Sequence, residues 1–338
     1  MKRGEKRALA TLRPAVLPHV APLLEPVEFT GKRTIHEHIR LSAEQLEEVT
    51  ASLPCVLIDP HEIARHSDAH AAAVLAACSE RVPNAIPVLR LRSGALARTA
   101  HVCARGGMAL RLELHELLSG DIAQRVGSLV TEAKLDKDNL DLLIDLGSVD
   151  DLIPSGVSEA VRQVAAAVQA MSPCRSVAVI SSSWPKRLEV DRHGSAEIAR
   201  SNWTVWRDEL RVQPLGPLGT PAFGDMCIQH PDGVEGFDPK KMAVSATVRY
   251  ATEDHWIIVK GESTKRVPAK QQFPILAERL IEEHADRFDG SAHCQGCEDI
   301  VRTARGASGC GNAEAWRRIG TCHHITKTVE SLNRVIET

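Results

Sequence analysis

Charged side chains stand at or near the ends of short apolar runs that lie far apart in the sequence: Asp59, Arg90, Arg92, Arg111, Glu113, Asp145 and Asp225. If the runs are parallel strands of a barrel, their carboxyl ends meet at one mouth and these side chains share a cleft. Carboxylates with facing arginines could bind a divalent metal and a phosphate there. Two of the acids could instead serve as general acid and base. The alternative is that arginines and acids pair and close the barrel end.

The candidate catalytic residues are therefore Asp59, Glu113, Asp145 and Asp225, and the candidate ligand-binding residues are Arg90, Arg111, Ser182 and His323. No GxSxG elbow surrounds the serines at 181–183, so phosphate binding or capping of the next turn is favoured over a nucleophile. His323 and His324 stand at the predicted start of the last helix. One of them could reach the mouth, although a capping or core role is the favoured alternative.

A second constellation lies near the carboxyl end, where four of the nine cysteines gather: Cys294, Cys297, Cys310 and Cys322. Cys294 and Cys297 form a CxxC turn, and His293, His323 and His324 are nearby in the sequence. A CxxC turn places two sulfurs about one metal, so the four cysteines predict a closed structural zinc site. The alternative is four free thiols. A redox role is disfavoured because no thioredoxin-like pattern flanks the turn.

The elements that would position these residues are repeated strand–helix units. Residues 139–148 form an apolar run around Asp145 that is typical of a strand buried on both faces. Seven such runs end near residues 25, 59, 90, 113, 145, 182 and 225, and helical patterns separate them. This alternation predicts an α/β fold, a (β/α)8 TIM-like barrel over residues 1–245, with an eighth unit either before Arg3 or after Asp225.

Residues 246–338 differ in pattern and predict a C-terminal subdomain packed on the barrel. It begins with a β-hairpin over 246–250 and 255–260, continues with a helix over 272–283, and ends with the cysteine-rich segment and a helix from about Ile325. Within the barrel we also expect a helix from Ser42 to about Ser52, started by a capping box, and another over Glu197–Leu210.

Composition excludes several classes of function. The 338 residues are 43% hydrophobic and 25% charged with net charge −3, which is ordinary for a globular protein and gives no electrostatic case for nucleic acid. Aromatic residues make up 3%, which disfavours base-stacking modules. No apolar run approaches the roughly 18 residues of a membrane span, and the basic start has no signal-peptide core. We expect a cytoplasmic protein without a membrane partner.

Three segments, residues 223–231, 248–261 and 311–326, together resemble the Beta protein family of phages and bacteria, and the resemblance covers nearly the whole chain. It implies association with phages and with bacterial mobile or defence loci, and it implies no established reaction. Two positions depart from the family pattern. Family members usually begin with an extra short strand that is absent here, which implies that the barrel is incomplete at its first strand or that the start is misplaced. They also usually carry Asn where this chain has Cys322.

The sequence thus leaves three hypotheses of function. The first is ligand or protein recognition through the barrel mouth within a phage–bacterium conflict system, with a partner protein encoded in the same locus. The second is a barrel hydrolase that acts on a phosphate-containing or nucleotide substrate through the strand-end carboxylates. The third is a zinc-bearing interaction module at the carboxyl end. No standard catalytic motif decides between recognition and hydrolysis.

Overall fold

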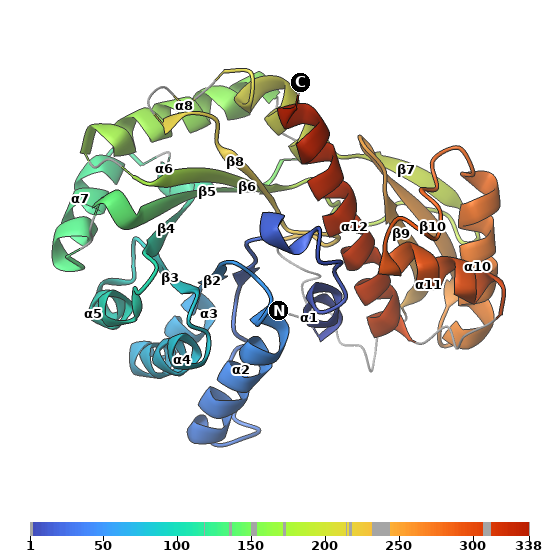
Figure 1. Ribbon diagram of the computed structural model, residues 1–338, viewed down its shortest axis with the longest axis horizontal. Coiled ribbons are helices and arrows are strands. Elements are labelled where there is room, and N and C mark those ends of the chain that lie inside the picture. Colours follow the sequence, from blue (N-terminus) through green and yellow to red (C-terminus); the bar gives the residue numbers. More distant parts are fainter. Residues whose placement is uncertain are drawn as a thin grey trace. The chain divides into compact units, whose positions relative to one another are not determined.

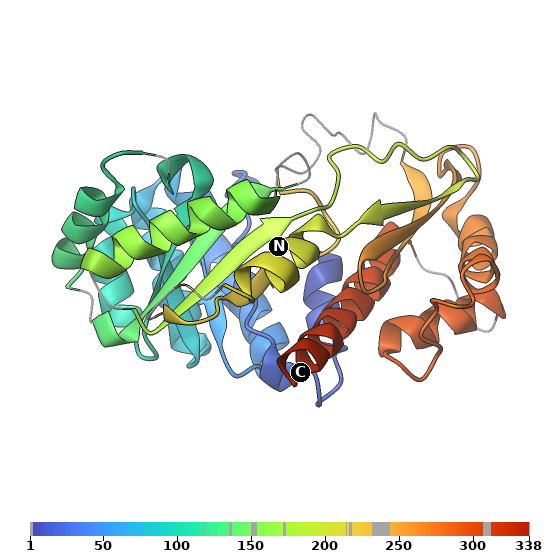
Figure 2. The same cartoon turned by 90° about the horizontal axis from the view of Figure 1, so that it is seen from above.

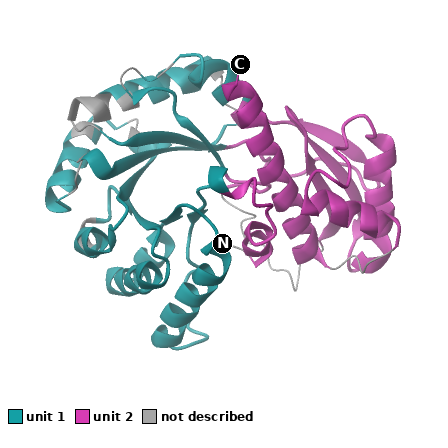
Figure 3. Ribbon diagram, in the orientation of Figure 1, with its two compact units in different colours: residues 1, 18–181, 204–225 teal, residues 2–17, 182–203, 226–338 magenta. Residues whose placement is uncertain are grey.

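The computed structural model of the chain divides into two compact units, which are coloured separately in Figure 3. Unit 1 contains residues 18–181 and 204–225, and unit 2 contains residues 2–17, 182–203 and 226–338. Each unit is therefore assembled from segments that are distant in the sequence, and the boundary at residues 245/246 stays a prediction. The structure describes residues 3–117, 119–134, 137–149, 154–171, 174–213, 215, 218–231, 244–306 and 312–337.

Unit 1 is built on a parallel sheet of seven strands that curls into an open half-barrel (Figure 1). The predicted α/β class and the seven strand-bearing repeats are confirmed. Among the described residues, however, the strands do not close into a complete (β/α)8 barrel. In spatial order the strands are β1 (Leu23–Leu24), β2 (Val56–Ile58), β3 (Ala85–Arg90), β4 (Met108–Glu113), β5 (Leu140–Ser148), β6 (Ser176–Ser182) and β8 (Ala222–Asp225).

The central strands are buried on both faces, as their continuous apolar sequences predict. Every residue of β2 and β3 is buried, and so are the first seven residues of β5. A parallel sheet shows this pattern when helices cover one face and side chains fill the other. Water is therefore excluded from the strands up to their carboxyl ends, where the polar residues begin.

Helices alternate with the strands of unit 1 and lie on the outside of the curl (Figure 1, and from above in Figure 2). Among the described residues, no helix has both the length and the apolar character needed to cross a bilayer. The helices between β1 and β6 are α2 (Ile35–Thr50), α3 (His61–Ala64), α4 (Asp68–Arg81), α5 (Gly94–Cys103), α6 (Leu114–Leu117), α7 (Ile122–Glu132) and α8 (Pro154–Met171).

The start predicted for α2 is wrong because a capping group earlier in the chain begins the helix. Thr34 is the N-cap, and its hydroxyl accepts a hydrogen bond from the Glu37 amide at 3.2 Å. Ser42, which was expected to cap the helix, lies inside it and donates to the His38 carbonyl at 2.7 Å. Both serine and threonine can form either bond, so the local sequence offers two starting points.

Unit 2 combines an antiparallel sheet with helices on the described parts of the chain. The sheet has the order β7-β10-β9, and β9 and β10 form the predicted hairpin. Helix α10 packs against both strands of the hairpin, and α12 packs against β9, α11 and α1. The elements are α1 (Arg3–Leu9), β7 (Ser195–Ala199), β9 (Ser245–Ala251), β10 (His255–Ser263), α10 (Ala269–Glu283), α11 (Gln295–Ala304) and α12 (Ala313–Ile336).

The helix predicted over Glu197–Leu210 is wrong in its first part. Strand β7 occupies Ser195–Ala199 and pairs antiparallel with β10, and α9 begins only at Ser201. Exposed and half-buried residues alternate along β7, which matches the period of a strand. The pairing partner lies some sixty positions later in the sequence, so local helix propensity did not reveal it.

Gly107, directly before β4, has a backbone conformation that only glycine adopts easily. Its φ is +112°, and a Cβ there would lie 2.6 Å from the Asn139 carbonyl oxygen and 2.8 Å from a guanidinium nitrogen of Arg175. We predict that Gly107→Ala lowers the free energy of unfolding by about 2 kcal/mol, since clash and strained φ act together. Urea unfolding measures this.

The adjacent glycine provides a matched control. A Cβ at Gly106 would meet nothing within 4 Å, so Gly106→Ala should leave stability unchanged or raise it by about 0.5 kcal/mol. Equal unfolding midpoints for the two variants would contradict the close approach of β4 to Arg175.

Candidate functional site

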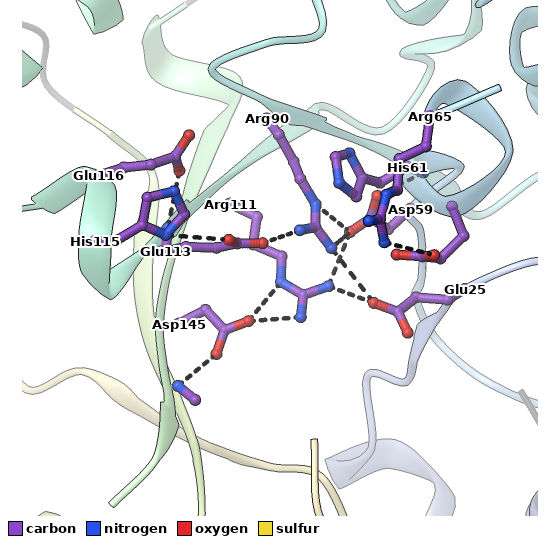
Figure 4. Close-up of polar contacts among 12 residues, drawn as sticks. Glu25, Asp59, His61, Arg65, Arg90, Arg111, Glu113, His115, Glu116 and Asp145 are labelled. Atoms are coloured by element: carbon purple, nitrogen blue, oxygen red, sulfur yellow. Dashed lines mark hydrogen bonds and ion pairs between the residues drawn. The ribbon is translucent and has the colours of Figure 1, made fainter. Parts of the chain in front are cut away.

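Six charged residues meet at the carboxyl-terminal edge of the half-barrel in unit 1 (Figure 4). We call them the strand-end cluster: Glu25, Asp59, Arg90, Arg111, Glu113 and Asp145. Glu25 and Asp59 directly follow β1 and β2, and the other four lie on β3, β4 and β5. Parallel strands present their carboxyl ends at one edge of a sheet, which brings together residues from five separate repeats.

Arg90 links three of the carboxylates. Its Nε and Nη2 donate to Asp59 Oδ2 at 3.0 and 2.8 Å, and its Nη1 donates to Glu113. Nη2 also lies 3.4 Å from Glu25 Oε1. Every nitrogen of this guanidinium group therefore faces an acid.

Arg111, in register with Arg90 on the neighbouring strand, is held in the same way. Its Nε and Nη2 donate to Asp145 Oδ2 at 2.8 and 2.5 Å. Its Nη1 donates to Glu25 Oε1 at 2.7 Å and to Asp59 Oδ2 at 2.8 Å. Burial disfavours the charge of Arg111, but the fields of Asp145, Asp59 and Glu25 outweigh burial and raise its pKa above the ordinary value.

Backbone amides hold the second oxygens of the two buried acids. Asp59 Oδ1 accepts from the His61 amide at 3.0 Å, and Asp145 Oδ1 accepts from the Gly147 amide at 2.9 Å. Gly147 has φ +65°, which a glycine adopts without strain. Burial, followed by the charge of Arg90, lowers the pKa of His61. These contacts fix Asp59 and Asp145 in place.

Exposure divides the cluster into a buried layer and a half-exposed one. Asp59 and Asp145 are 1% and 5% exposed, and both arginines are 6% exposed. The side chains of Glu25 and Glu113 are 42% and 34% exposed. Four carboxylates and two guanidinium groups leave a formal charge of −2, since four negative charges minus two positive ones remain. The surplus negative charge thus meets solvent at Glu25 and Glu113.

The arrangement can bind a positively charged group more readily than an anion. A phosphate would have to displace carboxylates from Arg90 and Arg111, because their nitrogens are already engaged. A cation, by contrast, can approach the half-exposed carboxylates of Glu25 and Glu113, where at Glu113 it would displace the exposed His115, whose Nδ1 lies 3.4 Å from Glu113 Oε2. Among the described contacts, the arginines therefore neutralise the buried acids instead of reaching outward.

The convergence predicted for the strand ends is found for Asp59, Arg90, Arg111, Glu113 and Asp145, and Glu25 was missed although it ends the first apolar run. Asp225 lies on β8, opposite Ser181 in register and at the other end of the strand order from β1. Catalytic roles for these acids stay predictions.

Ser182 forms local bonds of the kind expected for a capping serine. Its hydroxyl accepts from the Trp184 amide at 3.2 Å and donates to the Gln229 carbonyl at 3.3 Å. All three residues belong to unit 2. A ligand-binding role for Ser182 stays a prediction.

Unit 2 contains a buried group of sulfur and imidazole donors, which we call the thiol–imidazole group: His293, Cys294, Cys297 and His323. Cys294 is the N-cap of α11, and its sulfur accepts from the Cys297 amide at 3.3 Å. His323 Nδ1 lies 3.2 Å from Cys297 Sγ and 3.9 Å from Cys294 Sγ. Donor atoms of His293, Cys294 and His323 lie within 4.8 Å of one another, a spacing that could hold a metal ion.

The predicted position of the histidine pair at a helix start is wrong. Helix α12 begins at Ala313, with Asn312 as its cap, so His323 and His324 lie in its interior and are fully buried. His323 Nε2 lies 2.7 Å from the Ala251 carbonyl oxygen, and its ring stacks on Tyr250 with centroids 3.8 Å apart. Burial lowers the pKa of His323 to about 4, so the imidazole is neutral near pH 7.

One of the other two predicted zinc ligands borders this group. Cys322 is buried, and its thiol contacts the Cys294 thiol as well as the Thr11 carbonyl, which lies 3.9 Å from its sulfur. Cys310 lies outside the described residues. Sequence spacing therefore singled out the CxxC pair of this group. The histidines beside it were noted without being assigned as metal ligands.

The family model described as Beta protein matches residues 1–330 of the 338-residue chain. No curated protein matches the sequence. The family resemblance carried by residues 223–231, 248–261 and 311–326 is therefore confirmed.

Removal of a buried arginine should strongly destabilise unit 1. Arg111→Met leaves Asp145 without its bonded counter-charge, and leaves Asp59 with Arg90 alone, at positions that are almost fully buried. We expect the free energy of unfolding to fall by about 3–5 kcal/mol, the range for a broken buried ion pair. Chemical denaturation measures the change.

Arg40→Met is the matched control, because it removes the same charge and the same length of side chain at a different position. Arg40 is exposed, and its ion pair among the described residues is with Glu44, one turn away on α2, so the expected loss is about 0.5 kcal/mol or less. A loss at Arg111 as small as at Arg40 would mean that the strand-end cluster contributes nothing to the fold.

Proposed function

The chain belongs to the Beta protein family, and we propose that it recognises a positively charged ligand at the strand-end cluster. One observation carries the proposal: four carboxylates surround two arginines, and the surplus acids, Glu25 and Glu113, are half-exposed. An amine, a guanidinium group or a divalent cation would complete the charge balance there. The ligand group could belong to a small molecule or to a protein side chain.

Recognition has more support than catalysis because the buried acids are already engaged. Asp59 and Asp145 each have one oxygen on arginine and the other on a backbone amide. A general base needs a lone pair free to accept a proton from the substrate. The buried layer is suited instead to holding Glu25 and Glu113 in fixed positions, which preorganises a binding site.

The hydrolase alternative would place a phosphate-containing substrate on Arg90 and Arg111. It requires that the substrate break several charge-assisted bonds, each stronger than an ordinary hydrogen bond. The recurrent strand-end acids are its support, and the engaged state of Asp59 and Asp145 weighs against it. Recognition needs no such rearrangement.

We place this recognition in a phage–bacterium conflict system, in the cytoplasm, with a partner protein encoded in the same locus. The support for this setting is the family membership and the associations of that family. A lysine or arginine of the partner would present the cationic group that the strand-end cluster requires.

We further propose that zinc is the metal of the thiol–imidazole group. Thiolate sulfur and imidazole nitrogen are the donors that tetrahedral zinc prefers, and the buried position suits a structural ion. Zinc would stabilise unit 2 and would take no part in the strand-end cluster of unit 1.

The test of recognition is binding of simple cations to the strand-end cluster. Agmatine, putrescine and magnesium chloride are titrated into the wild-type chain by calorimetry, and at least one should bind. Glu113→Gln should weaken that binding by about 10–100-fold, which corresponds to losing one charged hydrogen bond. Failure of all three probes to bind the wild type would overturn the proposal.

Glu47→Gln is the matched control, because Glu47 is an exposed acid of α2 that also pairs with an arginine, Arg81. It should bind the probe as the wild type does. If Glu47→Gln and Glu113→Gln weaken binding equally, the effect comes from net charge and the strand-end cluster is not the binding site.

The partner can be tested by co-purification. A tagged chain expressed from its own locus should retain a neighbouring gene product, and the double variant Glu25→Gln/Glu113→Gln should lose it. Recovery of the tagged chain alone from wild-type cells would contradict a stable partner.

A further inference from the structure

The thiol–imidazole group defines four donors for one ion. Building on the zinc proposed for unit 2, we infer that its ligands are Cys294 Sγ, Cys297 Sγ, His323 Nδ1 and His293 Nε2. The ion would tie the turn before α11 to the middle of α12. Two thiolates and two neutral imidazoles make a closed site without an open position, so the ion is structural.

The two sulfur–nitrogen separations at His323 suit tetrahedral coordination. Zinc bonds of about 2.3 Å to sulfur and about 2.0–2.1 Å to nitrogen place sulfur and nitrogen about 3.5 Å apart at tetrahedral angles. The two distances from His323 Nδ1, 3.2 Å to Cys297 Sγ and 3.9 Å to Cys294 Sγ, lie on either side of that value. Small side-chain rotations would equalise them.

The imidazole of His323 is oriented as a metal ligand would be. Its Nε2 lies 2.7 Å from the Ala251 carbonyl, so this nitrogen carries the proton and donates. Nδ1 then has its lone pair directed at the two sulfurs. Stacking on Tyr250 fixes the plane of the ring. Metal-binding histidines usually donate their other ring N–H to a carbonyl or carboxylate in this way.

His293 supplies the fourth donor by the same logic. Its Nδ1 lies 3.8 Å from Glu330 Oε2, which favours a proton on that nitrogen. Its Nε2 is buried and has no hydrogen-bond partner among the described residues. A buried nitrogen without a partner is costly, and a metal ion shared with Cys294 and His323 would satisfy it.

The backbone brings the two halves of the site together through glycine. A Cβ on Gly296 would lie 2.5 Å from the Ile319 carbonyl oxygen and 3.4 Å from His323 Cβ, so α11 meets α12 closely only because this residue is glycine. Gly296 stands between the two cysteines, and its close approach places Cys297 against His323.

Cys322 lies next to His323 in the helix and is therefore rotated by about 100° around its axis. Its sulfur faces the Thr11 carbonyl and also contacts the Cys294 thiol, whereas Cys297 Sγ lies 3.2 Å from His323 Nδ1. We therefore assign Cys297 as the second sulfur ligand instead of Cys322, and Cys310 is not needed once four donors are present. The set differs from the four cysteines that sequence spacing predicts.

The experiment measures zinc per chain by mass spectrometry on the full-length protein after dialysis without chelator. The wild type should retain about one zinc, because structural zinc is held tightly. Cys297→Ser and His323→Gln should each retain less than half as much as the wild type. Cys322→Ser and Cys310→Ser, which are matched controls for loss of a thiol, should retain as much as the wild type.

Two outcomes distinguish an error in the proposed ligands from an error in the proposal of zinc itself. Wild-type protein that neither retains zinc nor takes it up on titration overturns zinc itself. A zinc-bearing wild type from which Cys322→Ser removes the ion overturns this ligand set alone. Because a ligand variant can also fail to fold, X-ray absorption of the wild type provides a second test. It should give two sulfur and two nitrogen neighbours, and any other count overturns the set.

Discussion

The structure of unit 1 depends on how two buried arginines are neutralised. Arg90 and Arg111 each lie only 6% exposed at the end of an apolar sheet, where an unpaired charge would cost several kcal/mol. Asp59 and Asp145 meet that requirement, with Glu25 and Glu113 at the solvent side. The acids come from β1, β2, β4 and β5 or the residues directly after them, so the pairing can form only when these strands run parallel and in order.

The same dependence explains which parts of the site could be predicted from sequence. An apolar run that ends in a charged residue identifies a strand end, and parallel strands bring their ends together, so the convergence of Asp59, Arg90, Arg111 and Asp145 follows from pattern alone. The acids that each arginine bonds cannot be predicted from this pattern. Arg111 bonds acids from three different strand ends, which depends on the curl and register of the sheet and on no local signal.

The errors in secondary structure have two physical origins. Residues 195–199 have helix-compatible composition, and pairing with β10, distant in the sequence, makes them a strand, which sequence periodicity does not reveal. The starts of α2 and α12 are set by the local caps Thr34 and Asn312, and several residues of each segment could have served as the cap.

Buried polar groups find their partners in different ways in the two units, and the functions proposed for the units differ accordingly. In unit 1 opposite charges satisfy one another, and the surplus is negative and half-exposed, so what remains to be bound is an external positive charge. In unit 2 the buried donors are thiol sulfurs and imidazole nitrogens, and the buried Nε2 of His293 has no hydrogen-bond partner among the described residues. The zinc proposed for this group would complete the set inside the unit. The strand-end cluster is therefore suited to reversible recognition, whereas the thiol–imidazole group is suited to permanent stabilisation.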